Sequence, residues 1–465
     1  MTRAVAVRAA VLLAALAVPA SAPSALGPRY GGTLRVGVIE LPALDPAPPR
    51  SSDERLLAGM AHATLVTAGP EGQPLPELAA GWSSAASGRE WTLRLREAAF
   101  HDGAPLTADD AVRSLRRFLR SGSPAAGQMA AALAGGAAFR QGAADVLPGV
   151  EARGPHTVVL RFDAARPLAL APLASPAAAI TSTSGAGAGP FAPSAVIAGR
   201  RAAFAAAAMH LRGRPYLDRV ELTVVPEAAL GAELQAGRVD LALNGGGGPL
   251  AGVLLLLVDA ARPPFDRAPV RAAVAVAVDR ANLVRHLLPG GEAGTALLPP
   301  VLLPPLGTDT PRPAADAPRS PTTLAVSREV PSLVSQRVVA HLSDLGLQVA
   351  AEPRAPARVL GGPPAALRLW IWSPEVAEPG LALQELAALL PPQPAASEAL
   401  AAAAAEMDLD RRRALLYRAE AALRATGLLV PLAAVPVSYR AAPRLQDVRV
   451  DTAGRVALED AWWEP

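Results

Sequence analysis

Cysteine and lysine are both absent from the 465-residue sequence, and each absence excludes a class of chemistry. Without cysteine the chain can form no disulfide framework, offers no thiol nucleophile and has no N-terminal cysteine to carry a lipid anchor. Without lysine it has neither the phosphate-binding lysine of a P-loop nor an amine for a Schiff base. All 44 basic residues are therefore arginine.

Recognisable catalytic and metal-binding patterns are also missing. The sequence contains no G-x-S-x-G nucleophile elbow, and its glycine run at 185–189 opens no helix, which argues against a dinucleotide site. Its histidines are scattered, with no H-E-x-x-H motif and no pair at metal-ligand spacing. We therefore expect no catalytic residue, no metal site and no cofactor. The histidines are His62, His101, His156, His210, His286 and His341.

Opposite charges nearly balance, because the formal net charge is +3. No cluster of arginines is large enough to form a basic face, so we expect no nucleic-acid partner. A hydrophobic fraction of 51% with 18% charged residues is typical of a globular protein. A chain of 465 residues is too long for one ordinary core, and we expect two or three domains.

The N-terminus carries the pattern of an export signal. Arg3 and Arg8 precede an apolar run over 9–18, and residues 20–22 offer an A-x-A cleavage motif. The run is shorter than the about 20 apolar residues of a membrane-spanning helix, and no other segment reaches that length. We predict a signal peptide over residues 1–27 and an exported protein without a membrane anchor.

Residues 90–119 form the most clearly patterned stretch. Apolar and polar residues alternate over 91–96, which is the two-residue period of a strand with one buried face. Gly103 then allows the backbone to turn, and Thr107 with Asp110 forms a variant of the capping box that opens helices. Apolar residues at helical spacing follow. The stretch predicts a strand, a tight turn and a helix.

This stretch resembles a segment of the solute-binding proteins that serve peptide, nickel and opine ABC importers (extracellular solute-binding proteins, family 5). The resemblance lies in a strand that ends in L-R, followed by F-H-D-G and then by T-A-x-D. Three further segments resemble this family. They are G-G-T-L-R-V-G with L-D-P over 31–46, L-x-x-G-x-x-D over 234–240, and P-P-F-D through A-x-D-R over 263–280. With gaps, the resemblance runs from residue 31 to residue 460.

The resemblance implies an α/β fold of the periplasmic-binding-protein type (type II, peptide-binding subclass). It comprises two lobes joined by hinge crossings, with an additional domain inserted in the first lobe. We expect lobe I to consist of residues 28–47, 166–248 and 437–465. The inserted domain is expected over 48–165, and lobe II over 249–436.

Residues 369–379 stand where the resembled family has G-W-x-x-D-x-x-D-P. The resemblance aligns Trp372 with the family's tryptophan, Glu375 with its first aspartate, and Glu378 with the aspartate before proline. In peptide-binding members that first aspartate holds the α-amino group of the ligand. The resemblance therefore implies Glu375, Trp372 and Glu378 as candidate ligand-binding residues. A charged hydrogen bond of this kind contributes roughly 1.5–3 kcal/mol.

Other interpretations of these residues stay open. A glutamate beside a proline in an irregular stretch is usually a solvated surface group. Trp370 and Trp372 lie two residues apart on one strand face, and they suit packing in the core equally well. Glutamate also places its charge one methylene further out than aspartate, so a shifted peptide register and a different cationic ligand are both open.

The resemblance implies a component of an ABC importer that captures a peptide or similar small solute between its lobes and delivers it to a membrane permease. We expect a monomeric periplasmic protein whose partners are the solute and the permease in the inner membrane. Two departures from the family pattern motivate an alternative. The family's N-x-x-Y-W motif is missing at 206–210, and the segment from the glycine-rich joint at 244–249 to Pro263 is short. The alternative is a degenerate homologue that acts as a periplasmic partner or sensor protein without transport.

Overall fold

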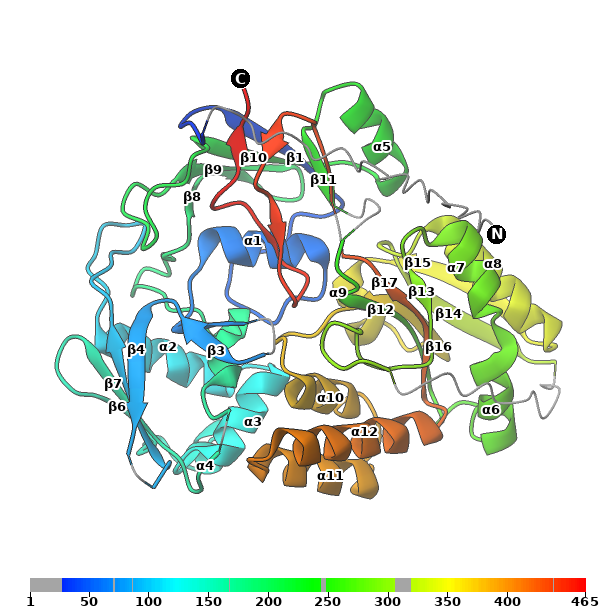
Figure 1. Ribbon diagram of the computed structural model, residues 1–465. Coiled ribbons are helices and arrows are strands. Elements are labelled where there is room, and N and C mark those ends of the chain that lie inside the picture. Colours follow the sequence, from blue (N-terminus) through cyan, green and yellow to red (C-terminus); the bar gives the residue numbers. More distant parts are fainter. Residues whose placement is uncertain are drawn as a thin grey trace, which may run out of the picture.

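The computed structural model describes residues 27–465, with the exception of 70–71, 86, 167, 244–247, 306–318 and 438. The predicted signal peptide thus lies outside the described residues, except for its last residue. We call the parts built on the two six-stranded sheets lobe I and lobe II, and the part built on the four-stranded sheet the inserted unit. Figure 1 shows lobe I at the top, the inserted unit at the lower left and lobe II at the right.

Lobe I is built on a mixed sheet with the strand order β18-β11-β1-β10-β9-β8. Its strand β1 (Thr33–Val38) runs parallel to both neighbours, β10 (Arg219–Val224) and β11 (Leu241–Leu243). The outer strands pair in antiparallel fashion. They are β8 (Phe191–Ile197), β9 (Arg201–Ala206) and β18 (Tyr439–Ala441).

Two helices cover the two faces of this sheet. Helix α1 (Ser52–Ala61) packs its apolar side on the even-numbered residues of β1, which are buried in the same core cluster. Helix α5 (Glu227–Gln235) lies on the opposite face. A Cβ atom at Gly37 would lie 2.7 Å from the Leu230 Cδ2 atom, so the close approach of α5 requires a glycine in β1.

Lobe II is built on the sheet β13-β17-β12-β16-β14-β15. Its strand β12 (Gly252–Val258) is buried at all seven positions and lies antiparallel to β16 (Leu367–Trp372) and β17 (Leu429–Val435). Burial on both faces explains why β12 is a continuous apolar run rather than an alternating one. The other strands are β13 (Glu292–Ala293), β14 (Pro321–Ser327) and β15 (Gln348–Arg354).

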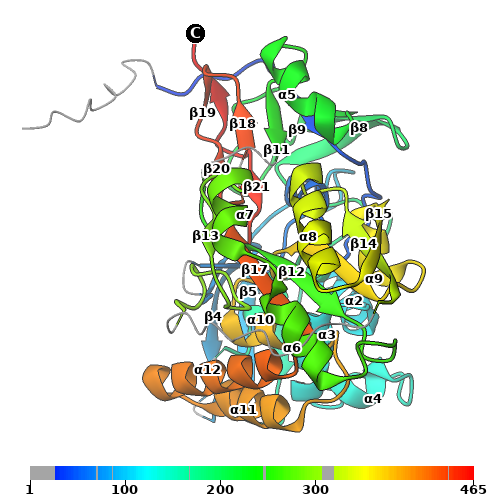
Figure 2. The same cartoon turned by 90° about the vertical axis from the view of Figure 1, so that its right-hand side faces the viewer.

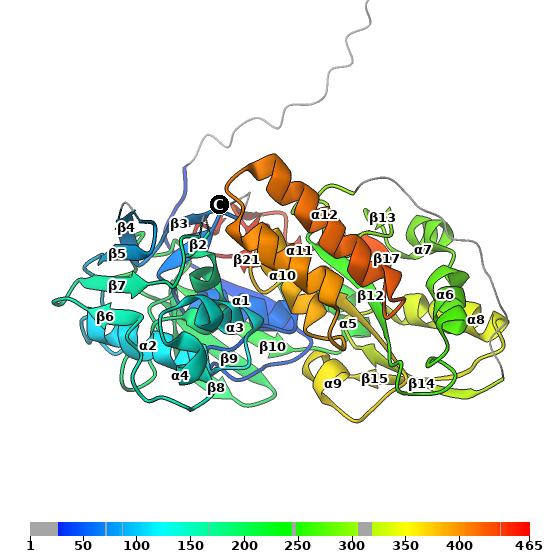
Figure 3. The same cartoon turned by 90° about the horizontal axis from the view of Figure 1, so that it is seen from below.

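Helices cover both faces of the lobe II sheet, as Figure 2 shows from the side of this lobe. Helices α6, α7 and α8 share one core cluster with β12, and α10, α11 and α12 share another. Figure 3 shows the second group from below, with α10 between the lobe II sheet and α3 of the inserted unit. The helices are α6 (Ala268–Ala277), α7 (Arg280–Leu287), α8 (Ser332–Asp344), α9 (Pro356–Gly361), α10 (Pro379–Ala387), α11 (Pro394–Ala405) and α12 (Leu409–Ala425).

The inserted unit contains the stretch that the sequence predicts as strand, turn and helix, and the structure has these elements as β5 (Glu90–Leu95) and α2 (Ala108–Arg120). Gly103 has a φ of +84° in the turn. The capping box is present, since Asp110 Oδ2 accepts a hydrogen bond from Thr107 N at 3.0 Å and Asp110 N donates to Thr107 Oγ1 at 3.4 Å. The other elements are β2 (Val66–Ala68), β3 (Pro74–Pro76), β4 (Ala79–Ser84), β6 (Val150–Ala152), β7 (Thr157–Arg161), α3 (Pro124–Ala132), α4 (Gly136–Arg140) and the 3₁₀ turns Ala171–Ala174 and Pro176–Ala178.

Two chain crossings join the lobes, which is the architecture expected from the sequence. The chain passes from β11 of lobe I to β12 of lobe II, and returns from β17 to β18. The crossings contact each other, because Pro249 O accepts hydrogen bonds from Ala251 N at 2.8 Å and from Val437 N at 3.0 Å. Most of the joint predicted at 244–249 lies outside the described residues. The chain ends in the short strands β19 (Leu445–Gln446), β20 (Arg449–Val450), β21 (Val456–Ala457) and β22 (Trp462–Trp463).

The residues that pack together in the core of the inserted unit differ from the range predicted for the inserted domain, 48–165. Helix α1 falls inside those bounds, yet its residues Leu56 and Met60 pack in the core of lobe I. Leu170 and Ile180 fall outside them, yet they pack in the core of the inserted unit, which reaches to residue 188. The predicted division stays a prediction. The limits of the cores do not coincide with its bounds at residues 48 and 165.

Candidate functional site

A cavity of about 440 Å³ lies between the two lobes, and we call it the larger cavity. Its volume is within the range of small-ligand pockets, roughly 300–1,000 Å³. All three parts of the molecule line it, so a molecule bound there would contact both lobes. The lining includes Ser52 and Arg55 of lobe I, Gly122 and Pro124 of the inserted unit, and Glu329 and Trp372 of lobe II.

Strand β16 supplies the aromatic part of this lining. Trp370 and Trp372 are both buried, and they belong to one core cluster because residues two apart on a strand share a face. The indole Nε1 of Trp372 donates to Glu385 Oε1 of α10 at 2.9 Å. With this donor already bonded, Trp372 offers a solute an apolar surface rather than a hydrogen bond. It both packs in the core and lines the cavity.

The loop that follows β16, residues 373–378, carries Glu375, and we call it the site loop. Glu375 is only 4% exposed. Its Oε1 atom accepts one hydrogen bond from Ser123 Oγ at 2.6 Å and another from Ser175 Oγ, both from the inserted unit. Its Oε2 atom is buried and has no hydrogen-bond partner among the described residues. A buried oxygen without a partner is costly, so a hydrogen-bond donor is missing at this position.

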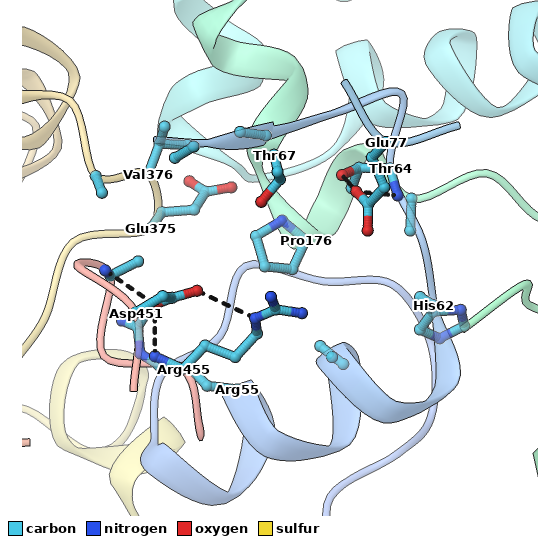
Figure 4. Close-up of a pocket in the computed structure, with 17 residues that line it drawn as sticks. Arg55, His62, Thr64, Thr67, Glu77, Pro176, Glu375, Val376, Asp451 and Arg455 are labelled. Atoms are coloured by element: carbon cyan, nitrogen blue, oxygen red, sulfur yellow. Dashed lines mark hydrogen bonds and ion pairs between the residues drawn. The ribbon is translucent and has the colours of Figure 1, made fainter. Parts of the chain in front are cut away.

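Glu375 lines a second hollow of about 70 Å³, which we call the small pocket. Figure 4 shows its carboxylate turned toward the pocket and the guanidinium of Arg455 reaching in from below. Asp451 Oδ2 accepts a hydrogen bond from Arg455 Nε at 3.1 Å, which fixes the guanidinium in place. The pocket has room for a few water-sized groups, each of which needs roughly 10–15 Å³.

The small pocket and the larger cavity adjoin each other. Arg55 lines both of them. Ser123, which donates to Glu375, stands between Gly122 and Pro124 of the larger cavity's lining. The Glu375 carboxyl group therefore lies next to the wall of the larger cavity without lining it.

Arg55 of α1 ties lobe I to the site loop. Its Nη1 atom donates to Pro374 O at 2.8 Å, and its Nη2 atom donates to Ser373 O. Burial lowers the pKa of the Arg55 guanidinium, while the carboxyl groups of Glu385, Asp451, Glu329 and Glu375 act in the opposite direction. A second contact between the lobes lies nearby, where Ser52 N donates to Glu329 Oε1 at 2.8 Å.

The carboxyl groups around Arg55 favour their neutral form. Burial raises the pKa of Glu329 to about 8 and that of Glu385 to about 7. Burial also raises the pKa of Glu375, although the hydroxyls of Ser123 and Ser175 oppose this shift. One buried guanidinium is thus too little positive charge to keep all of these carboxyl groups ionised.

Glu378 lies at the end of the site loop, and its predicted role in ligand binding stays a prediction. Its two carboxylate oxygens cap α10, accepting hydrogen bonds from Gly380 N at 3.0 Å and Leu381 N at 2.8 Å. Its Oε1 atom also accepts from Arg412 Nη2 of α12 at 2.6 Å. The carboxylate is 3% exposed, fully occupied, and lines neither the larger cavity nor the small pocket. These contacts favour a structural role.

The structure therefore gives the three predicted residues three different surroundings. Trp372 lines the larger cavity, Glu375 lines the small pocket, and Glu378 caps a helix. The sequence offered no signal for the polar residues that complete the site. Each belongs to an ordinary helix or cap pattern and becomes part of the site only through contacts with distant segments. They are Arg55, Ser123, Ser175, Glu329 and Glu385.

Two kinds of feature are absent from the part of the chain that the structure describes. None of its helices combines the length and the apolar character that a membrane crossing requires. Within the same residues, no three side chains of His, Asp or Glu are placed to hold a metal ion.

The sequence matches the model of a protein family described as bacterial extracellular solute-binding proteins, family 5, over residues 73–322. A probable peptide ABC transporter periplasmic-binding protein of Sinorhizobium fredii is 31% identical over 111 residues. This alignment covers 24% of the chain and 21% of the relative, so it spans about a fifth of the relative's length.

Solved structures share the fold over nearly the whole chain. The murein tripeptide binding protein MppA of Escherichia coli is 19% identical with a TM-score of 0.83, covering 94% of this chain and 99% of that one. The periplasmic binding protein DppA of Helicobacter pylori, in complex with a peptide, is 16% identical with a TM-score of 0.80 and covers 94% and 99%. These similarities confirm the predicted periplasmic-binding-protein fold of the peptide-binding subclass.

Proposed function

The chain belongs to the bacterial extracellular solute-binding proteins of family 5, and from this premise we propose that it captures a short peptide between its lobes and delivers it to an ABC permease. The relatives from Sinorhizobium and Escherichia are named for peptides, and the one from Helicobacter is in complex with a peptide, which supports this class of solute. The proposed role is binding without catalysis. It is exercised in the periplasm by a monomer, after removal of residues 1–27.

The observation that carries the proposal is the larger cavity between the lobes. A solute in it contacts α1 of lobe I and β16 of lobe II at once, so the closed arrangement gains contacts that an open one lacks. Ligands shift a conformational equilibrium by their difference in affinity for its two states. Closure about the two crossings then signals a loaded protein to the permease.

Glu375 is the proposed anchor for the amino group of the peptide. Its Oε2 atom is buried without a partner, and an ammonium group donates three hydrogen bonds. The carboxyl group lies beside the wall of the larger cavity, so a peptide in that cavity need extend only its amino end toward the small pocket. A bound ammonium also adds positive charge to a region in which several carboxyl groups surround the single guanidinium of Arg55.

A thermal-shift measurement tests the proposal. The protein, unfolded and refolded to remove any bound ligand, is melted with di- to pentapeptides and with their N-acetylated forms. A ligand at a hundredfold over its dissociation constant stabilises the folded state by roughly 2.7 kcal/mol. We expect free-amine peptides to raise the melting temperature and acetylated peptides to fail. A flat response to every peptide would contradict the proposed function.

The alternative role as a degenerate partner or sensor protein gains no support from the described residues. The larger cavity is well formed, and α1, the inserted unit and lobe II all contribute to its lining. The same thermal-shift panel separates the two roles, because a protein that binds no solute responds to none of its members.

A further inference from the structure

We propose that the solute carries a positively charged side chain in addition to its amino terminus, and that Glu329 in the larger cavity pairs with this second charge. The inference rests on the proposed function and assigns a specificity to the same cavity. The solute class is a short peptide with a guanidinium or ammonium side chain. Glu375 holds its amino group, and Glu329 holds its side chain.

The first step is the charge balance around Arg55. Its guanidinium has Glu329, Glu375 and Glu385 as acidic neighbours, yet it donates its hydrogen bonds to carbonyl oxygens of the site loop. Asp451, a fourth acidic neighbour, already accepts from Arg455. Three buried carboxyl groups therefore share one guanidinium. One guanidinium cannot keep all three ionised, so a further cation brought into the site would find a carboxyl group that can ionise and pair with it.

The second step is the lining of the larger cavity itself. Of the described residues that line it, Arg50 and Arg55 are the cationic ones. Arg50 is exposed, so water rather than a buried carboxyl group solvates its charge. Arg55 is already bonded to the site loop. Neither arginine side chain makes a hydrogen bond to a carboxyl group of the cavity wall. A cation brought by the solute would therefore displace no arginine from these carboxyl groups.

The third step distinguishes Glu329 from the other carboxyl group of this wall. Glu385 has both oxygens occupied, Oε1 by Trp372 Nε1 at 2.9 Å and Oε2 by Glu375 N at 2.9 Å. The Glu329 carboxyl group bonds to Ser52 alone among the described residues, with Asp53 and Arg55 as its charged neighbours on α1. It is 7% exposed and lines the cavity, so it can accept from a solute without losing an existing partner.

An independent observation at the adjoining small pocket points the same way. The Oε2 atom of Glu375 is unpartnered in a side chain that is 4% exposed, and Figure 4 shows the carboxylate facing the pocket. A hydrogen-bond donor is therefore missing at Glu375. Glu329 and the unpartnered oxygen of Glu375 lie in neighbouring hollows that share Arg55, which suits one solute with two donor-bearing cations. Trp370 and Trp372 cover the apolar stem between them.

The proposed pairing of Glu329 with a cation makes the preference for a basic side chain depend on pH. Burial raises the pKa of Glu329 to about 8, so the empty cavity holds this carboxyl group mainly as the neutral acid at neutral pH. A cation pairs with the ionised form, and its binding must release the proton. The preference for a basic side chain therefore increases as the pH rises from about 6 toward about 9, while guanidinium keeps its own charge throughout.

The test is a calorimetric titration with two matched dipeptides, Ala-Arg and Ala-citrulline. They share the amino group, the carboxylate and the shape of the side chain, and they differ in the side-chain end, which is a charged guanidinium in Ala-Arg and a neutral urea in Ala-citrulline. We expect Ala-Arg to bind about tenfold more tightly, which is the effect of one charged hydrogen bond. In Glu329→Gln this ratio falls to about one. In Glu398→Gln, a control on an exposed residue of α11 in the same lobe, the ratio is unchanged.

Each outcome decides the matter. A tenfold ratio that disappears in Glu329→Gln, together with proton release on binding Ala-Arg, supports the inference. Equal affinities, or a ratio that survives in Glu329→Gln, overturn it while the proposed peptide-binding function stands. If neither dipeptide nor any longer peptide binds, the proposed function fails, and this inference fails with it.

Discussion

Two buried arginines, Arg412 and Arg55, reach the site loop from different sides and end in different surroundings. Both residues are 8% exposed. Arg412 donates directly to the Glu378 carboxylate at 2.6 Å, and the same carboxylate caps α10. Arg55 donates to two backbone carbonyl groups, although three carboxyl groups without another cation surround it.

The comparison shows that burial alone does not identify a binding residue. Glu378 and Glu375 are three residues apart and are buried to nearly the same extent, 3% and 4% exposed. What separates them is whether their oxygens are satisfied. A carboxylate with every oxygen bonded stabilises the fold, whereas one with a vacant buried oxygen is prepared to bind a donor.

Breaking the satisfied pair should have the largest effect on stability. Glu378→Ala leaves Arg412 buried without its partner and removes the cap of α10. Loss of one member of a buried ion pair costs about 3–5 kcal/mol, and we expect a loss of this size in urea unfolding. The double variant Glu378→Ala with Arg412→Met should recover part of it. A loss below about 1 kcal/mol would show that this pair is not structural.

Glu375→Gln should mainly affect binding. It keeps the shape of the side chain and its serine contacts but removes the charge offered to the peptide amine. We expect the affinity for a free-amine peptide to fall about 10- to 100-fold, the equivalent of roughly 1.5–3 kcal/mol, as measured by calorimetry. Glu398→Gln serves as the control and should bind normally. Unchanged affinity in Glu375→Gln would remove it as the anchor.

The carboxyl groups around Arg55 should make the stability of the empty protein depend on pH. Burial raises the pKa of Glu329 from 4.5 to about 8 and that of Glu385 from 4.5 to about 7, so the folded state holds protons that the unfolded state releases. Between the unfolded pKa of 4.5 and the folded values of about 8 and about 7, the unfolded state binds fewer protons than the folded state. The free energy of unfolding therefore falls as the pH rises through this range.

The expected slope is on the order of 1 kcal/mol per pH unit for each group that titrates. Urea unfolding from about pH 5 to about pH 8 measures it, and Glu329→Gln should flatten it. A variant whose slope matched that of the original protein would show that Glu329 is ionised in the folded state and that the charge balance around Arg55 is wrong.

The smallest effect is expected from Ser123→Ala. Ser123 caps α3, with its Oγ accepting from Ala126 N at 3.1 Å, and it also donates to Glu375. Loss of such a cap costs about 1 kcal/mol, and the change leaves Glu375 with Ser175 alone. Ser397→Ala, at an exposed position of α11, is the control in thermal unfolding. Equal melting temperatures for the two variants would argue against the cap and its link to Glu375.

The fold could be predicted from the sequence because its signals are local. The alternation over 91–96 and the box formed by Thr107 and Asp110 specify a strand and a helix within a few residues, and both are present. The sequence also predicts a helix over 53–68, and this prediction is wrong at its end, because α1 ends at Ala61 and β2 begins at Val66. The family resemblance, carried by such segments, then supplied the lobes and the class of function.

The site was predicted only in part because its contacts are distant in sequence. Glu375 meets Ser123 and Ser175 across 252 and 200 residues, and Arg55 meets Pro374 across 319. Nothing near Arg55 distinguishes it from an exposed helix arginine. Glu375 and Glu378 also look alike in the sequence, since each stands in the same irregular stretch beside a proline. Their difference arises entirely from tertiary partners.

The most direct measurement is a crystal structure of the protein with a bound dipeptide such as Ala-Arg. The account predicts the peptide in the larger cavity, with its amino nitrogen within hydrogen-bond distance of Glu375 Oε2, the buried oxygen that has no partner in the structure described here. A peptide whose amino group is held elsewhere, with Glu375 still bonded to Ser123 and Ser175 alone, would contradict it.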